Sequence, residues 1–105
     1  MSEGIQGGNV SAEGVITQSI TPAQVATIVT VEQTFTVPGL KVGDFVAVSA
    51  PGIQAGAAIT GARVSAADTL AITFTNPTAG NVTPLTGDHL IHYVRPGLTL
   101  SAVSD

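Results

Sequence analysis

Polar and apolar residues alternate along several stretches of the chain with the two-residue period of a half-buried β-strand. In residues 27–37, the apolar side chains fall on one face and mainly Thr and Glu fall on the other. Residues 69–76 alternate in the same way, with Leu70, Ile72 and Phe74 predicted to point inward. Both stretches are therefore predicted to be strands with one face toward a core.

Three further strands are predicted from less regular patterns. Residues 45–49 are apolar on both faces, which is typical of a central strand or of a strand that is covered twice. Residues 57–64 are rich in Ala and Gly and form a weaker strand candidate. A final strand is expected over residues 89–95, and a short terminal strand over residues 98–102 could follow it.

The segments between these strands are rich in turn-forming residues, and no amphipathic helix is predicted. Residues 21–24 read Thr-Pro-Ala-Gln, which could cap a single helical turn. No strand–helix–strand unit is present, which argues against a parallel α/β sheet. Residues 1–14 contain four Gly residues and no periodicity, so they are predicted to form a flexible or extended N-terminal arm.

Short strands separated by turn signals at this spacing are typical of sandwiches and barrels. We therefore predict an all-β fold, with a single small β-sandwich or jelly-roll-like barrel over residues 15–105 and the arm over residues 1–14. The length of 105 residues suits one domain.

Charged residues make up only 10% of the chain, against roughly 25% in ordinary soluble domains. A surface short of charge suits a protein that is packed against other subunits; the alternative is a neutral surface rich in Thr and Ser. The net charge is −4 and only Lys41, Arg63 and Arg95 are fixed cations, which argues against binding to nucleic acid. No apolar run approaches the roughly 20 residues that span a bilayer, so no membrane partner is expected.

The sequence offers little that could carry catalysis. His89 and His92 are three residues apart on a predicted strand, so they should point to opposite faces, one exposed and the other packed or hydrogen-bonded. There is no cysteine, no Gly-x-Ser-x-Gly motif and no calcium-loop pattern among the seven scattered carboxylates. Asp44 and Asp68 lie at predicted turns, where an Asp side chain bonds nearby backbone. We therefore predict no enzymatic activity, no catalytic residue, no metal and no cofactor.

Four residues are candidates for a protein–protein interface. Tyr93 is the one aromatic ring with a polar group, and its neighbours on the same face of the strand are Ile91 and Arg95, which could form an intersubunit patch. Arg63 and Arg95 lie in weakly charged strands, where an Arg is a salt-bridge partner, an interface anchor or an ordinary exposed residue.

The turns and strand ends carry a further pattern. Its segments are Thr34-Phe35-Thr36-Val37-Pro38-Gly39-Leu40, Val42-Gly43-Asp44, Pro51, Arg63-Val64-Ser65-Ala66-Ala67-Asp68-Thr69-Leu70, Ile72-Thr73-Phe74-Thr75-Asn76 and Thr83-Pro84. This pattern resembles a short β module of small virion structural proteins of tailed bacteriophages, over about residues 30–95. The motifs are those of a scaffold and include no active site.

The resemblance implies a virion structural protein, above all a head decoration (cement) protein that binds between capsid subunits. The implied partners are the major capsid protein or other virion subunits, and a homo-oligomer, a trimer or a dimer, is expected. The implied location is the virion, after synthesis in the host cytoplasm, because Met1-Ser2-Glu3-Gly4 lacks the basic start of a secretion signal. The alternative is a fibre, tail or receptor/carbohydrate-binding β module, which the 4% aromatic content disfavours.

Overall fold

The computed structural model describes residues 10–53 and 55–97, which form six strands and no helix. The strands are β1 (Val10–Ile20), β2 (Val29–Thr36), β3 (Phe45–Ser49), β4 (Ala58–Ala66), β5 (Thr69–Asn76) and β6 (Gly87–Pro96). The predicted all-β fold is therefore confirmed.

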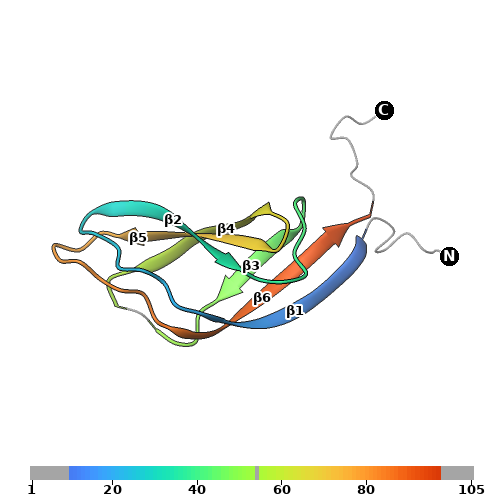
Figure 1. Cartoon of the computed structure of the whole chain (residues 1–105). Helices are drawn as coiled ribbons and strands as arrows, with labels where there is room; N and C mark the ends of the chain where they lie inside the picture. Colours follow the sequence, from blue (N-terminus) through green and yellow to red (C-terminus); the bar gives the residue numbers. More distant parts are fainter. Residues whose placement is uncertain (1–9, 54, 98–105) are drawn as a thin grey trace, which may run out of the picture.

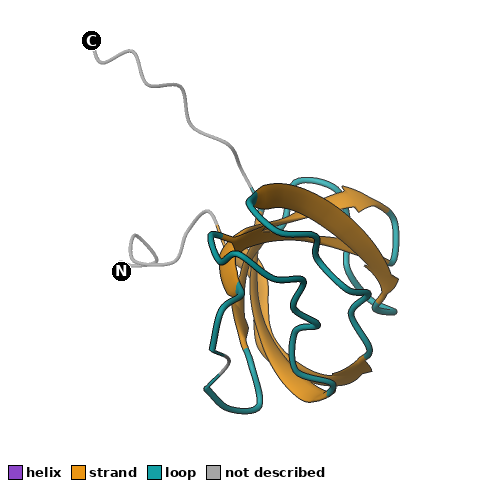
Figure 2. Ribbon diagram, turned by 90° about the vertical axis from the view of Figure 1, so that its left-hand side faces the viewer, coloured by secondary structure: helices purple, strands orange, loops and turns teal. Residues whose placement is uncertain are grey.

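The six strands form two three-stranded antiparallel sheets that pack together as a small β-sandwich (Figures 1 and 2). One sheet has the order β1-β6-β3 and the other has the order β2-β5-β4. The middle strands, β6 and β5, thus have a hydrogen-bonded neighbour on each side. Of the two predicted architectures, the sandwich is the one observed.

The core lies between the sheets and is built from the alternating apolar positions of both middle strands. Leu70, Ile72 and Phe74 are each at most 1% exposed, as predicted from the pattern in β5, and Ile91 of β6 meets them from the other sheet. Ala71 lies on the outer side of β5, and it is nevertheless fully buried. Its small methyl group lies between two longer neighbours across the sheet, Thr34 and Arg63.

The position of β3 in its sheet differs from the predicted one. Among the described residues, β3 is hydrogen-bonded to β6 alone, so it is an edge strand and the predicted central position is wrong. It is also not covered on both faces, because Phe45 is 72% exposed. The apolar residues on the outer side of β3 therefore contribute to the surface rather than to a second core.

β1 begins at Val10, five residues before the predicted start of the folded domain. Residues 10–14 are consequently strand and not arm, because they pair with the end of β6 from Pro96 to Tyr93. Gly14 permits this pairing, since a Cβ there would lie 3.2 Å from the ring of Tyr93. Residues 1–9 and the possible strand at 98–102 lie outside the described residues.

The connection between β1 and β2 is not helical, so the helical turn considered for residues 21–24 is wrong. The side-chain amide of Gln33 holds this segment instead. Its Oε1 accepts the N–H of Ala23 at 2.8 Å and its Nε2 donates to the carbonyl of Ala23 at 3.0 Å. Both backbone groups are thus satisfied without a helix.

Asn76, at the end of β5, is fully buried and fixes two loops. Its Nδ2 donates to the carbonyls of Val25 (3.0 Å) and Gly80 (2.9 Å), among others, and its Oδ1 accepts from the N–H and the hydroxyl of Thr78. A backbone bridge between Val25 and Val82 lies beside it. This end of the sandwich is therefore closed by hydrogen bonds to one amide side chain.

Candidate functional site

The outer face of the β1-β6-β3 sheet is the most unusual surface of the described structure. Its side chains form three rows across the strands, which are Glu13–Val94–Phe45, Val15–His92–Ala47 and Thr17–Leu90–Ser49. Val15 is 62% exposed, Phe45 is 72% exposed and Leu90 is 48% exposed. We call the surface formed by Val15, Phe45, Ala47, Leu90 and Val94 the apolar face.

The apolar face is hollowed in its middle. A depression of about 270 Å³ lies there, lined by Val15, Ala47, Val48, Ser49, Leu90 and His92. At its border the Nε2 of His92 lies 2.9 Å from the Oε2 of Glu13, and both side chains are about half exposed. The surface thus combines a shallow hollow and exposed apolar side chains with one polar pair beside them.

The two edge strands of this sheet, β1 and β3, border the apolar face and leave backbone groups available for pairing. Within the described residues, no strand is hydrogen-bonded to the outer edge of β1 or of β3. Such an edge presents unpaired N–H and C=O groups that can pair with another chain. β1 has 11 residues, so it gives the longer of the two edges.

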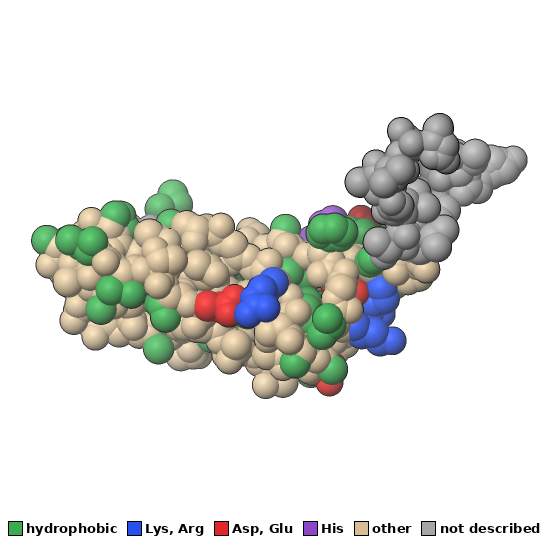
Figure 3. All heavy atoms as spheres, turned by 90° about the horizontal axis from the view of Figure 1, so that it is seen from above, with side chains coloured by type: hydrophobic (Ala, Val, Ile, Leu, Met, Phe, Trp, Pro, Cys, Tyr) green, Lys and Arg blue, Asp and Glu red, His purple; other side chains and the backbone are tan. Residues whose placement is uncertain are grey.

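The outer face of the β2-β5-β4 sheet has a different character. We call it the threonine face, because it carries Thr30, Thr34, Thr36, Thr60, Thr73 and Thr75. The hydroxyl of Thr75 lies 3.1 Å from that of Thr30 and 3.3 Å from that of Thr60, so the three strands are linked by a row of hydroxyl groups. The space-filling view shows few charged side chains on the side that faces the viewer (Figure 3).

Arg63 belongs to the threonine face and makes an exposed ion pair. Its Nε and Nη2 donate to the two carboxylate oxygens of Glu32, at 2.8 and 2.9 Å. These hydrogen bonds hold the pKa of Glu32 below its ordinary value. Of the roles considered for Arg63, the salt bridge is therefore confirmed.

The predicted interface stripe on β6 points inward. Ile91 is fully buried in the core, so the prediction that it forms part of an interface is wrong. Tyr93 is partly buried and packs against the same core, and the Arg95 guanidinium lies 5.5 Å from the centroid of its ring. The period of two correctly places these residues on one face, but that face is the inner one.

Arg95 ties the end of β6 to the connection between β2 and β3. Its Nε and Nη2 donate to the carboxylate of Asp44, both at 2.9 Å, and Nη2 also donates to the carbonyl of Gly39 at 2.8 Å. The Asp44 side chain is 1% exposed. Hydrogen bonds from Arg95 hold the pKa of Asp44 below its ordinary value, although burial opposes this effect. The salt-bridge role of Arg95 is therefore confirmed.

Both turn aspartates bind backbone, as expected. Asp44 accepts the N–H of Lys41 at 2.9 Å, within its own turn. Asp68 reaches across to a different turn, where it accepts the N–H of Gly39 at 2.8 Å. Asp68 itself has a φ of 60°, a left-handed conformation that Asp tolerates better than most residues.

The two histidines lie on opposite faces of β6, as predicted. His89 is 1% exposed and its Nδ1 lies 2.9 Å from the carbonyl of Gly87, whereas His92 lies on the outer side. In the described part of the chain, no group of three or more His, Cys, Asp or Glu side chains could hold a metal ion. Residues 10–53 and 55–97 also include no helix long and apolar enough to cross a membrane.

No protein-family model matches this chain, and neither a curated protein nor a solved structure does. The function is therefore argued from the surface itself. Sequence reasoning missed the apolar face, although one signal for it was present in residues 45–49, which are apolar on both faces. That signal was attributed to a second buried layer.

Proposed function

We propose that the protein is a virion structural protein, a capsid decoration (cement) protein that binds between capsid subunits and stabilises the head. The observation that carries this proposal is the apolar face, with Val15, Phe45 and Leu90 each about half exposed or more. An apolar surface of this kind gains free energy when a partner covers it. The choice of a capsid as the partner rests on the resemblance of the turns to those of phage virion proteins.

The free energy that one copy gains by burying the apolar face is modest. This suits a protein that binds the shell in many copies. Full burial of a Val, Leu or Phe side chain contributes roughly 1.5–3 kcal/mol, and these three side chains begin about half exposed or more. Their burial would then contribute about 3 kcal/mol for each copy. A protein that binds the assembled shell but not its separated subunits stabilises the shell by mass action.

The free edge of β1 supports a homo-oligomer within the same proposal. Two copies related by a two-fold axis would pair identical edges and satisfy the backbone groups of both. A trimer would instead place three copies around a symmetry axis of the shell. Native mass spectrometry of the purified protein distinguishes these two states, and a protein that stays monomeric at every concentration would remove the oligomer from the proposal.

The test is co-sedimentation with heads of the virus that encodes the protein. We expect the wild-type chain to pellet with these heads, and the double variant Val15→Lys/Leu90→Lys to stay in the supernatant. The matched control is Thr34→Lys/Thr36→Lys, which adds the same charge to exposed positions of the threonine face. The control should pellet like the wild type.

Head stability gives a second measurement. Wild-type protein should raise the temperature at which heads release their contents, and the Val15→Lys/Leu90→Lys variant should not. If the wild-type protein ignores heads, the decoration role is wrong. If both lysine pairs abolish binding equally, the apolar face is not the contact surface.

A further inference from the structure

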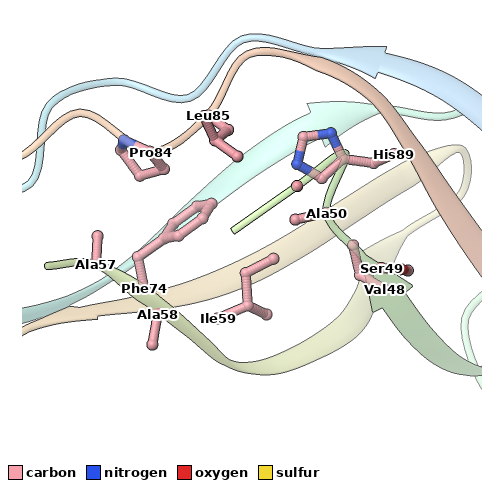
Figure 4. A pocket seen from close by; sticks show the side chains of 11 residues that line it. Val48, Ser49, Ala50, Ala57, Ala58, Ile59, Phe74, Pro84, Leu85 and His89 are labelled. Atoms are coloured by element: carbon pink, nitrogen blue, oxygen red, sulfur yellow. The ribbon is translucent and has the colours of Figure 1, made fainter. Parts of the chain in front are cut away.

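A second hollow lies next to the connection between β3 and β4, where it opens to the surface. It is a cavity of about 420 Å³ whose walls include Ile59, Phe74, Ala57, Pro84, Leu85 and His89 (Figure 4). Phe74 is 1% exposed and Ala57 is 6% exposed, so the floor of the cavity is core. The volume lies within the range of small-molecule sites, roughly 300–1,000 Å³.

Several of the lining residues are small. Ala50, Gly52, Ala57 and Ala58 all line the hollow and present nothing larger than a methyl group. A larger side chain at the buried position Ala57 would take up part of this space. This hollow is lined by residues of both sheets and is open to solvent on one side, and it is unrelated to the proposed contact with a capsid.

His89 is the one titratable residue in the cavity wall, and it is buried. Its Nδ1 lies 2.9 Å from the carbonyl of Gly87, and since a carbonyl only accepts, Nδ1 carries a proton. In the neutral imidazole, Nε2 is then a hydrogen-bond acceptor. No described residue donates to Nε2, although the side chain is 1% exposed. Figure 4 shows the imidazole projecting into the space beside Leu85 and Phe74.

We propose that this cavity binds a small, uncharged, largely apolar molecule that carries one hydroxyl group, such as a phenol. The apolar side chains of the wall, Ile59, Phe74 and Leu85, would contact its hydrocarbon part, and its hydroxyl would donate to Nε2 of His89. A buried acceptor without a donor costs free energy, so a ligand that supplies the donor is favoured over a ligand of the same shape that does not.

The test compares p-cresol with p-xylene, which has nearly the same shape and replaces the hydroxyl by a methyl group. Titration of the ¹⁵N-labelled protein, followed by ¹H–¹⁵N NMR, should shift the amides of Ile59, Phe74 and His89. The dissociation constant for p-cresol should be about 3–10-fold lower than that for p-xylene, as one hydrogen bond provides. His89→Leu should remove this difference and leave p-xylene binding in place.

A pair of glycine variants locates the site without changing His89. A Cβ at Gly52 would lie 3.6 Å from the Cδ1 of Leu85, an ordinary contact, so Gly52→Val places its side chain at the cavity wall. Gly80→Val is the matched control, because a Cβ there meets nothing within 4 Å. Gly52→Val should weaken p-cresol binding at least fivefold, and Gly80→Val should leave it unchanged.

Three results would overturn the proposal. The first is equal binding of p-cresol and p-xylene to the wild-type protein, or binding of neither. The second is a set of NMR shifts that lies away from the cavity wall. The third is equal p-cresol binding by the two glycine variants. If His89→Leu does not fold, the ligand pair and the glycine pair still decide the question.

Discussion

The apolar face of the β1-β6-β3 sheet and the threonine face of the β2-β5-β4 sheet are both exposed, but they differ in what they leave unsatisfied. On the threonine face the hydroxyl groups of Thr30, Thr60 and Thr75 bond to one another, and Arg63 pairs with Glu32. On the apolar face Val15, Phe45 and Leu90 are each about half exposed or more, so much of their apolar surface contacts water. Both kinds of side chain favour strands, so strand propensity does not separate the two faces. The difference teaches that only one face of this sandwich gains free energy from being covered.

The largest expected effect is on the free energy of unfolding. It distinguishes the inner face of β6 from its outer face. Ile91→Ala removes a fully buried side chain and should lower the free energy of unfolding by about 2–5 kcal/mol. Leu90→Ala, one residue away but 48% exposed, should lower it by less than about 1 kcal/mol. Urea unfolding followed by circular dichroism measures both values. Equal losses would mean that Leu90 is part of the folded core and that the apolar face is smaller than described.

The next largest effect is expected on the affinity of the apolar face for its partner. The triple variant Val15→Thr/Phe45→Thr/Leu90→Thr turns the apolar face into a second threonine face and places a strand-favouring residue at each position. Its affinity for the partner of this face should fall about 100-fold, which corresponds to about 2.7 kcal/mol. Sedimentation with heads, or self-association measured by analytical ultracentrifugation, gives the comparison. A variant that assembles like the wild type would show that the backbone edges, and not these side chains, drive assembly.

A smaller effect tests the ion pair on the threonine face. Arg63→Gln should raise the pKa of Glu32 toward its ordinary value, because the guanidinium hydrogen bonds are lost. Since the pKa of Glu32 is lowered by folding, the pair contributes stability above the unfolded-state pKa and loses it as the pH falls through the folded-state pKa. The variant and the wild type should therefore differ slightly at pH 7 and converge in acid. NMR titration of the Glu32 carboxyl carbon measures the shift, and identical titrations would rule out the pair in solution.

The smallest effect is expected from the hydroxyl groups themselves. Thr30→Val/Thr75→Val removes a hydroxyl pair 3.1 Å apart and keeps the shape of both side chains. Because these groups are near water, the free energy of unfolding should change by no more than about 0.5 kcal/mol. Binding to heads should not change. Thermal unfolding and co-sedimentation check both statements, and a loss of binding here would move the contact surface to the threonine face.

The fold was predictable wherever one face of a strand is buried. The pattern in β5 correctly places Leu70, Ile72 and Phe74 in the core, because a period of two fixes which side chains share a face. The strand at residues 89–95 was also predicted, from a less regular pattern, and it lies inside the observed β6. The turn roles of Asp44 and Asp68 were also predictable, since a short carboxylate at a turn bonds nearby N–H groups.

Where both sides of a strand carry apolar as well as polar residues, the sequence pattern does not indicate which side faces the core. In β6 the odd-numbered face carries Ile91, Tyr93 and Arg95, and its Tyr and Arg suggested an exposed patch. Only the other sheet, distant in sequence, makes this face the buried one. For the same reason residues 45–49 suggested a second cover that the described structure does not contain. β1 was not predicted as a strand, and its partner, β6, is far away along the chain.

The register of β1 on β6 places Val10 opposite Pro96. The two ends of the described chain therefore leave the sandwich at the same corner, as Figure 1 shows. A short covalent link between residues 10 and 97 would make the polypeptide circular without crossing either sheet. Opening that circle between β3 and β4 would create a permuted chain with the same strand pairs in space, and its new ends would lie beside the cavity instead of beside Arg95.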